Sequence, residues 1–326
     1  MRIRILCPAP PGSRAGNRVT ALRWSRILRK LGHRVTIQPS FQGGPCDLLV
    51  ALHARHSARS ARRYRRLHPA NPLLLALTGT DVYHDIRWKG PARRTLDLAD
   101  RFIVLQPLAV RQLPRRLRAK ARVIFQSVEP TTPKPSPTLG AFEVCVVGHL
   151  RPIKDPFLAA RAVRKLPGSS RLRVLHAGRA LTRSMERMAR AETGRNPRYS
   201  WLGDLPRWKA RRLIARSRLL VLSSRMEGGA HVLSEAAVDG VPVLSSRIDG
   251  SVGLLGEGYP GFFPCGDTRA LRRLLLRAEA DPAYLAGLKR RIGSRASLFD
   301  PFREEATWRS LLAEISPRTK GGNRSH

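Results

Sequence analysis

Two glutamates with seven residues between them, Glu227 and Glu235, enclose the glycine pair Gly228-Gly229, and no stretch of the chain is better suited to chemistry. If 219–223 is a buried strand and 232–238 a helix, the glycines lie where the helix begins. Unpaired amides and the helix dipole favour an anion at that point, and a diphosphate fits there. Glu235 would then project toward a ribose beyond the phosphates, while Glu227 would face a sugar on the other side.

An isolated pair of glutamates is more often two solvated carboxylates on a surface helix. The glycine pair, together with the strand entry Gly-Val-Pro-Val-Leu at 240–244, favours the binding interpretation instead. The stretch resembles the Glu-x7-Glu signature of retaining-type nucleotide-sugar glycosyltransferases with the two-domain GT-B architecture. The predicted donor site also includes Val232 and Leu233, in the first turn of the expected helix.

A second loop follows the expected strand 142–147 and reads Gly-His-Leu-Arg-Pro-Ile-Lys from Gly148 to Lys154. Two cations three residues apart, Arg151 and Lys154, can clamp a diphosphate and offset the charge that grows on a leaving nucleotide. Two surface cations are common in so basic a chain, but the loop also resembles the Gly-x-Leu-x-x-x-Lys motif of group-4 glycosyltransferases. The segment around Gly203 resembles the part of that family beside the nucleotide base. The resemblance therefore adds Gly148, Arg151, Lys154 and Gly203 to the donor site.

The first half of the chain has its own glycine-rich loop, at 12–20, after the first expected strand. Its spacing departs from Gly-x-Gly-x-x-Gly, and the second expected strand ends at Gln38 without an acidic residue, which excludes NAD binding. A glycine-rich loop at a helix N-terminus can still hold an anion, with Arg14 and Arg18 nearby. A simple tight turn with solvated arginines is an equal alternative.

Two further loops end expected strands on the same side: 52–57, with a His-Arg-His cluster, and 77–83, with a Thr-Gly-Thr-Asp turn. Together they can bind a small anion or a sugar hydroxyl. Taken singly, Ser57 and either Thr80 or Asp81 are suitable helix caps. We predict acceptor binding by Gly16, Asn17, Arg18, His53, Arg55, Thr78, Gly79, Thr80 and Asp81, and catalytic roles for His53, Asp81 and Glu227.

The formal net charge of +38 would normally indicate nucleic acid or an anionic membrane surface as a partner. Only nine of the 61 basic residues are lysine, and the arginines are spread along the chain, with clusters at 62–66 and 115–118. We interpret this excess as a coding bias acting on solvated faces, and expect no specific nucleic-acid partner. Arginines that line a cleft would still attract small anionic substrates.

The sequence predicts neither a metal nor a cofactor. No Asp-x-Asp pattern occurs, so departure of a diphosphate would rest on cations and on the helix start at Gly228-Gly229. The four cysteines are far apart and have no zinc-ligand spacing, which predicts reduced, mostly buried thiols. They are Cys7, Cys46, Cys145 and Cys265.

The chain is expected to be cytoplasmic. Its first apolar run ends at Pro8 and is too short for a signal-peptide core, and no run approaches membrane-spanning length.

Apolar strand-like runs alternate with amphipathic stretches in both halves, which predicts parallel sheets covered by helices. Four prolines within 129–137 support neither a helix nor a central strand and predict a linker. The expected fold is GT-B: two α/β Rossmann-like domains that face each other across a central cleft, with a C-terminal helix crossing back to the first domain. The predicted domains are 1–128 (acceptor), 129–138 (linker), 139–296 (donor), 297–316 (crossover helix) and 317–326 (disordered tail).

Five strings are more specific than the Glu-x7-Glu pattern, and they lie at 16–24, 51–55, 77–81, 104–106 and 126–127. They read Gly-Asn-Arg-Val-Thr-Ala-x-Arg-Trp, Ala-Leu-His-Ala-Arg, Leu-Thr-Gly-Thr-Asp, Val-Leu-Gln and Gln-Ser. These strings resemble the selenosugar synthases of selenoneine biosynthesis, and the resemblance runs through nearly the whole chain. It implies transfer from UDP-N-acetylglucosamine or UDP-glucose to selenophosphate, which forms a carbon–selenium bond and releases UDP and phosphate.

Selenophosphate is small, anionic and nucleophilic at selenium, so its enzyme needs cations and orientation more than a strong base. Arg18, His53 and Arg55 suit such an acceptor. A transient contact with the enzyme that produces selenophosphate would accompany this function. Two alternatives stay open: a conventional group-4 transferase acting on a hydroxyl of a lipid or polysaccharide, and a polyanion-binding protein with a degenerate transferase fold.

Overall fold

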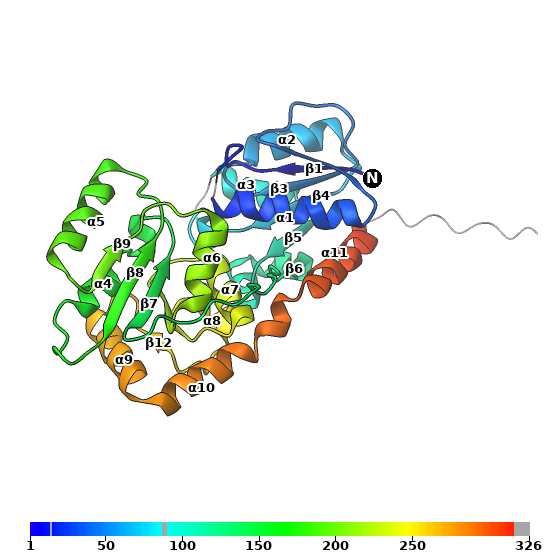
Figure 1. Ribbon diagram of the computed structural model, residues 1–326. Helices are drawn as coiled ribbons and strands as arrows, with labels where there is room; N and C mark the ends of the chain where they lie inside the picture. The colour runs from blue at the N-terminus through cyan, green and yellow to red at the C-terminus, as the bar shows by residue number, and fades with distance from the viewer. Residues whose placement is uncertain (14, 87–89, 316–326) are drawn as a thin grey trace, which may run out of the picture. The chain divides into compact units, whose positions relative to one another are not determined.

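The computed structural model describes residues 1–13, 15–86 and 90–315, and the chain divides into two compact units (Figure 1). Unit one consists of Met1–Leu105, Leu113–Ile124 and the C-terminal segment from Pro301. Unit two consists of Gln106–Gln112 and Phe125–Asp300. Each unit has one parallel sheet and its own hydrophobic core.

The sheet of unit one has six parallel strands in the order β2-β1-β3-β4-β5-β6. Its central strands β3 and β4 read LLVAL and LLLAL and are buried at every position, as expected for strands covered on both faces. The strands are β1 (Arg2–Leu6), β2 (Arg34–Gln38), β3 (Leu48–Leu52), β4 (Leu73–Leu77), β5 (Arg101–Val104) and β6 (Ala121–Val123), and the helices are α1 (Gly16–Lys30), α2 (Ala58–Leu67), α3 (Pro91–Leu98) and α11 (Pro301–Ile315).

The last helix, α11, completes the core of unit one (Figure 1). Trp308 on α11 packs edge to face against Trp24 on α1, with ring centroids 5.1 Å apart. The Trp24 indole donates to Glu304 Oε1 at 2.8 Å, and Arg23 lies 3.4 Å from the other oxygen of this buried carboxylate. A buried carboxylate needs such partners. The packing places the chain from Pro301 in unit one, while 297–300 of the predicted crossover segment belong to unit two.

The sheet of unit two also has six parallel strands, in the order β12-β11-β10-β7-β8-β9. The strands are β7 (Phe142–Val147), β8 (Leu172–Ala177), β9 (Tyr199–Trp201), β10 (Leu219–Leu222), β11 (Val243–Ser246) and β12 (Phe262–Phe263), and the helices are α4 (Leu158–Val163), α5 (Arg183–Arg195), α6 (Arg207–Arg216), α7 (His231–Asp239), α8 (Asp249–Leu255), α9 (Thr268–Ala280) and α10 (Pro282–Gly293).

Each sheet has one position where the strand order reverses direction. In unit one, successive strands are added on one side of β1 up to β2 and on the other side from β3 onward, so the order reverses between β1 and β3. In unit two, β8 and β9 are added on one side of β7 and β10 to β12 on the other, so the order reverses between β7 and β10. Open parallel sheets bind ligands outside the carboxyl ends of the strands at such a switch point. A binding site is therefore expected at the loops after β1 and β3 in unit one and after β7 and β10 in unit two.

The prediction of two α/β Rossmann-like units is confirmed by the two parallel sheets. Two boundaries of the first domain differ: the 3₁₀ turn Pro107–Gln112 and residues 125–128 belong to unit two, although the sequence placed both in the first domain. Contacts of the turn show why it belongs there. The reason is local packing, because Gln112 donates to Asp249 on α8 at 2.9 Å. The expected linker also lies with unit two, where Thr131 donates from both its amide and its hydroxyl to Asp239 at 2.8 Å.

Several other predictions from the sequence can be compared with the structure only in part. Arg14 and the expected disordered tail at 317–326 lie outside the described residues. Three of the four cysteines are buried, as expected, but Cys265 is exposed. No helix in the described part of the chain has the length and apolar character that a membrane crossing requires.

Candidate active site

The switch point of unit two brings together Lys154, which follows β7, and Glu227, which follows β10. The Lys154 ammonium donates to Glu227 Oε1, and the Ser224 hydroxyl donates to the same oxygen at 2.6 Å. The lysine side chain is 30% exposed and the glutamate side chain 12% exposed, so a ligand can reach the cation. The predicted donor cation and the predicted sugar-facing acid therefore form one hydrogen-bonded group.

Asp155 fixes the backbone of the Lys154 loop, and sequence reasoning missed it. It has a left-handed conformation with φ of +40°, which is uncommon for a residue with a side chain. Its buried carboxylate accepts from Arg161 at 2.8 Å and from Arg225 at 3.0 Å. The Ser223 hydroxyl lies 3.0 Å from the carbonyl oxygens of both Lys154 and Asp155. Side chains from the β10 loop thus hold the β7 loop in place.

The Glu227 loop packs against α8 and β11, which hold its backbone in place. A Cβ added to Gly250 on α8 would lie 2.1 Å from the Glu227 carbonyl oxygen, so only glycine allows this approach. The Ser246 hydroxyl donates to the Ser224 carbonyl at 2.5 Å. The sequence offered no signal for either contact, because both depend on how the loop packs on a neighbouring helix and strand.

Gly148 is supported by a buried histidine. His176 Nε2 lies 3.2 Å from the Gly148 carbonyl, and its Nδ1 lies 3.0 Å from the Tyr199 hydroxyl. Because a carbonyl can only accept, Nε2 carries the proton and Nδ1 of the neutral ring accepts from tyrosine. Burial lowers the pKa of His176 to about 4. Gly178 also packs here, since a Cβ on it would lie 1.9 Å from the Gly148 carbonyl oxygen.

Helix α7 carries Glu235 and begins just after the glycine pair, as predicted. Its N-cap residue, Ala230, contributes no side-chain hydrogen bond, so the amides of the first turn are not capped in this way. Arg211 and Arg207 on α6 lie 3.9 and 4.0 Å from the Glu235 carboxylate, which makes this end of the site more basic than the sequence suggested. The prediction that Leu233 contacts a ligand is wrong, because this residue is fully buried in the core of unit two.

The remaining residues predicted to bind the donor lie at the carboxyl ends of strands in the same sheet. Arg151 is exposed and directly precedes the 3₁₀ turn Pro152–Lys154, whose last amide donates to the Arg151 carbonyl at 2.9 Å. Gly203 follows β9 with a φ of +69°, a conformation that favours glycine. Its carbonyl accepts from the Gly178 amide at 2.8 Å. The loop after β9 is therefore joined to the Gly148 loop through Gly178.

The switch point of unit one brings together the loops after β1, β3 and β4. The Thr78 hydroxyl donates to the Asn17 side chain at 2.7 Å, which joins the glycine-rich loop to the Thr-Gly-Thr-Asp turn. Gly16 is the first residue of α1, and its carbonyl accepts from Thr20 at 3.0 Å. Arg18 lies near Cys7, whose thiol pKa is raised by burial and lowered in part by this arginine.

Asp81 differs from its predicted catalytic role. It is fully buried, and its two carboxylate oxygens accept from the Gly79 amide and the Ala54 amide, both at 2.9 Å. A carboxylate occupied in this way joins the β3 loop to the β4 loop and has no oxygen exposed to a substrate. The structure therefore gives Asp81 a turn-holding role. The sequence could not separate the two roles, because burial of this turn depends on the packing of two loops.

His53 lies at the end of β3 in a left-handed conformation with φ of +72°. It is 8% exposed, and its Nδ1 is buried without a hydrogen-bond partner among the described residues. Asp85, which the sequence analysis missed, lies 3.9 Å from His53 Nε2 and 3.9 Å from the Arg55 guanidinium. The His56 ring lies 4.3 Å from the His53 ring, and burial, followed by the charges of His53 and Arg55, lowers the pKa of His56. Strained and loosely paired polar groups are typical of a site that waits for a ligand.

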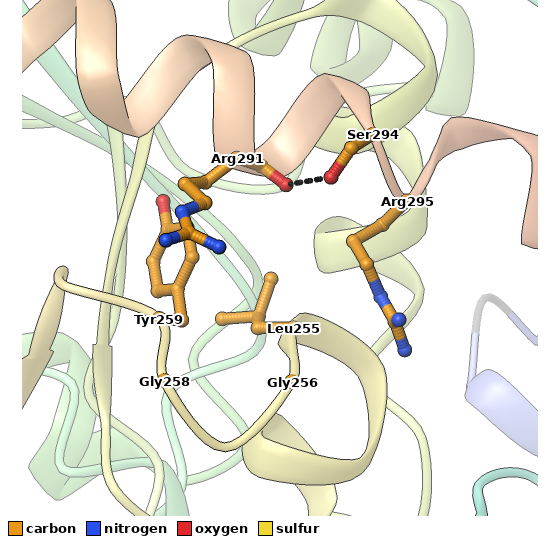
Figure 2. A pocket seen from close by; sticks show the side chains of 7 residues that line it. All are labelled: Leu255, Gly256, Gly258, Tyr259, Arg291, Ser294 and Arg295. Carbon is orange, nitrogen blue, oxygen red and sulfur yellow. Dashed lines mark hydrogen bonds between the residues drawn. The ribbon is translucent and has the colours of Figure 1, made fainter.

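One hollow of about 180 Å³ lies away from these residues, at the amino end of β12 (Figure 2). It lies where α8 and α10 end, and Arg295 donates to the Leu254 carbonyl at 2.9 Å. Carbonyls at a helix C-terminus favour a cation, so this arginine caps α8. The hollow is lined by Leu255, Gly256, Gly258, Tyr259, Arg291, Ser294 and Arg295, and it is explained by the two helix ends.

The chain has two Rossmann-like units, and the switch point of the second holds a cation, two glutamates and a helix that begins just after two glycines. These features together define a glycosyltransferase of the GT-B type. The chain belongs to the family of group 1 glycosyl transferases, whose model matches residues 130–298, more than half of its length. The match covers the predicted donor residues of unit two. By sequence, no curated protein matches the chain. The narrower group-4 assignment stays a prediction.

Solved structures share this fold over almost the whole chain. HepE of Anabaena in complex with UDP is 16% identical, with a TM-score of 0.80 over 97% of this chain and 100% of that one. HepE with UDP-glucose gives a TM-score of 0.78 at 16% identity and the same coverage. Sucrose-phosphate synthase of Thermosynechococcus elongatus gives 0.77 at 16% identity, over 96% of this chain and 98% of that one. The GT-B fold class predicted from the sequence is confirmed.

Proposed function

We propose that this glycosyltransferase transfers a sugar from a UDP-sugar to selenophosphate. The selenium lone pair attacks the anomeric carbon while the bond from that carbon to the diphosphate oxygen breaks, and its electron pair leaves on UDP. Water then cleaves the phosphorus–selenium bond and releases phosphate. The observation that carries the donor half is the Lys154–Glu227 group at the switch point of unit two.

The donor half rests on geometry and on the family. Lys154 and Arg151 lie on one loop beyond β7, where they can neutralise charge on the departing diphosphate. The uncapped start of α7 offers amides to the same group, and Glu235 follows in that helix to receive the ribose. The solved neighbours include complexes with UDP and with UDP-glucose, and this favours a uridine donor.

The acceptor half rests on convergence. Three of the strings that resemble selenosugar synthases are distant in sequence but lie beside one another at the carboxyl ends of β1, β3 and β4. The Asn17–Thr78 and Ala54–Asp81 hydrogen bonds join them directly. An Arg55 side chain that is 67% exposed is available to a small anion such as selenophosphate. A cytoplasmic location, predicted from the sequence, belongs to this proposal.

We also propose that the transfer needs no divalent metal, because the cations and amides of unit two supply the neutralising charge. Within the described residues, no group of three or more His, Cys, Asp or Glu side chains is arranged to hold a metal. Turnover should be unchanged by EDTA. Loss of activity with EDTA, followed by recovery when Mg²⁺ or Mn²⁺ is added, would contradict metal independence.

The experiment that tests the proposed function is mass spectrometry of the purified protein with UDP-N-acetylglucosamine or UDP-glucose, with and without selenophosphate. Selenophosphate would be made in place from selenide under reducing, anaerobic conditions. A selenium isotope pattern on a hexose or hexosamine, seen only with selenophosphate, is the expected result. UDP release without a selenium-containing sugar would contradict the acceptor while keeping the donor assignment.

A further inference from the structure

Helix α2 of unit one carries a stripe of four exposed arginines: Arg59, Arg62, Arg63 and Arg66. Their spacing is i, i+3, i+4 and i+7, which places all four on one helix face over a length of about 10 Å. The opposite face holds Ala58, Ala61 and Tyr64 in the core. The stripe therefore follows from the amphipathic pattern of this helix.

The four guanidinium groups line one hollow of about 350 Å³. Among the described residues, none of the four forms an ion pair with an acidic side chain. By contrast, Arg65 on the same helix turns away from the hollow and pairs with Asp100 at 2.7 Å. Among the described residues, the charges that line the hollow are thus not balanced by an acidic side chain.

The second arginine cluster of the chain, at 115–118, is arranged differently. Arg116 pairs with Asp97 at 2.6 Å, and Arg118 donates to the Leu113 carbonyl at 3.0 Å. A coding bias toward arginine would act on both clusters alike. The difference between them is therefore a property of the fold at α2, in addition to composition.

The unbalanced stripe has an electrostatic cost. Like charges at i, i+4 on one helix face destabilise the helix. Helix α2 has no acidic residue of its own in the first turn, and its N-cap residue Ser57 makes no side-chain capping hydrogen bond. A bound polyanion would remove this repulsion.

We propose that the α2 hollow is a binding site for a short chain of phosphates, of the oligophosphate class. Guanidinium groups bind phosphate oxygens in pairs, and four arginines on one helix face suit several adjacent phosphates better than one. The site is concave, and Leu67 is the one exposed large apolar side chain on this helix within the described residues, which disfavours insertion into a lipid surface. This site does not depend on the donor or the acceptor proposed above.

The test is titration calorimetry of the full chain with inorganic tripolyphosphate, at about physiological ionic strength and with excess UDP to occupy the donor site. Wild type should bind one tripolyphosphate, and R62A/R66A should bind it about tenfold more weakly. The matched control is R269A/R273A, which removes two exposed arginines with the same i, i+4 spacing from α9. Binding by this control should stay within about twofold of wild type.

Circular dichroism would show that each variant is folded, and R62K/R66K would keep the charge while losing the paired donors. The lysine variant should bind more weakly than wild type; equal binding would overturn recognition by guanidinium pairs. Absence of saturable binding to wild type, or equal weakening in R269A/R273A, would overturn the site. The site would also be overturned if the four arginines were needed for binding to anionic vesicles or to an oligonucleotide while tripolyphosphate did not bind.

Discussion

The two switch points of this chain have the same architecture but different states of pairing. In unit two, between β7 and β10, the central charges are already joined, with Lys154 bound to Glu227 and Asp155 held by two arginines. In unit one, between β1 and β3, the loops are joined through neutral or buried groups. There the side chains of His53 and Arg55 each lie 3.9 Å from the Asp85 carboxylate, which is too far for a hydrogen bond.

This difference separates a site that is built in advance from one that its ligand completes. A nucleotide diphosphate carries concentrated charge, and prepositioned cations with fixed loops lower the cost of binding it. In unit one, His53 and Arg55 each lie 3.9 Å from Asp85, and His53 keeps a buried ring nitrogen unpaired among the described residues. We infer that unit two provides the chemistry common to the family and that unit one sets the acceptor.

The largest expected effect tests the prebuilt half. Lys154→Ala should lower turnover by about a hundred- to thousandfold, because it removes a cation that stabilises the leaving diphosphate. Thermal unfolding should stay near that of wild type, since the lysine side chain is partly exposed. Lys165→Ala, at an exposed lysine of the same unit, is the control and should keep full activity. Normal turnover of Lys154→Ala would remove Lys154 from the site.

The next effect concerns the support beneath Gly148. Because the pKa of His176 is lowered to about 4, the unfolded state binds more protons between pH 6.5 and 4. Stability should therefore be greatest above pH 6.5 and fall by about 3 kcal/mol as the pH approaches 4. Denaturant unfolding across this range would measure it, and His176→Gln should flatten the pH dependence. An unchanged slope in the variant would show that other groups cause it.

A smaller effect separates structure from catalysis at Asp81. Asp81→Asn keeps one acceptor oxygen but loses the other, so it should lower the free energy of unfolding by about 2 kcal/mol. Turnover of the folded variant should fall much less than that of Lys154→Ala. Calorimetry and initial rates on the same preparation provide both values. A thousandfold loss of turnover at unchanged stability would restore the catalytic role given to Asp81 by the sequence.

The sequence predicted the layers and most elements because apolar runs and amphipathic spacing are local signals. It also located Lys154, Glu227 and Glu235, since each follows a strand or opens a helix in a recognisable motif. It missed Asp155 and Asp85, whose roles depend on contacts between loops that follow different strands.

Sequence patterns also could not predict which residues of a ligand-binding motif become buried. Asp81 and Leu233 lie in motifs that suggest ligand contact, yet tertiary packing encloses one carboxylate and one apolar side chain completely. The same holds for the 3₁₀ turn Pro107–Gln112, which follows unit one in sequence and packs with unit two. Such outcomes are set by long-range contacts, which no local period encodes.

The most direct test of the division between the units is an initial-rate study of Arg55→Ala in which UDP-sugar and the anionic acceptor are varied independently. We predict that KM for the acceptor rises about fivefold to tenfold while KM for the UDP-sugar is unchanged, because a hydrogen bond from a partly exposed cation to a small anion contributes about this much. Arg94→Ala, an exposed arginine of the same unit, should change neither value. A rise in KM for the UDP-sugar alone would contradict the assignment of the acceptor to unit one.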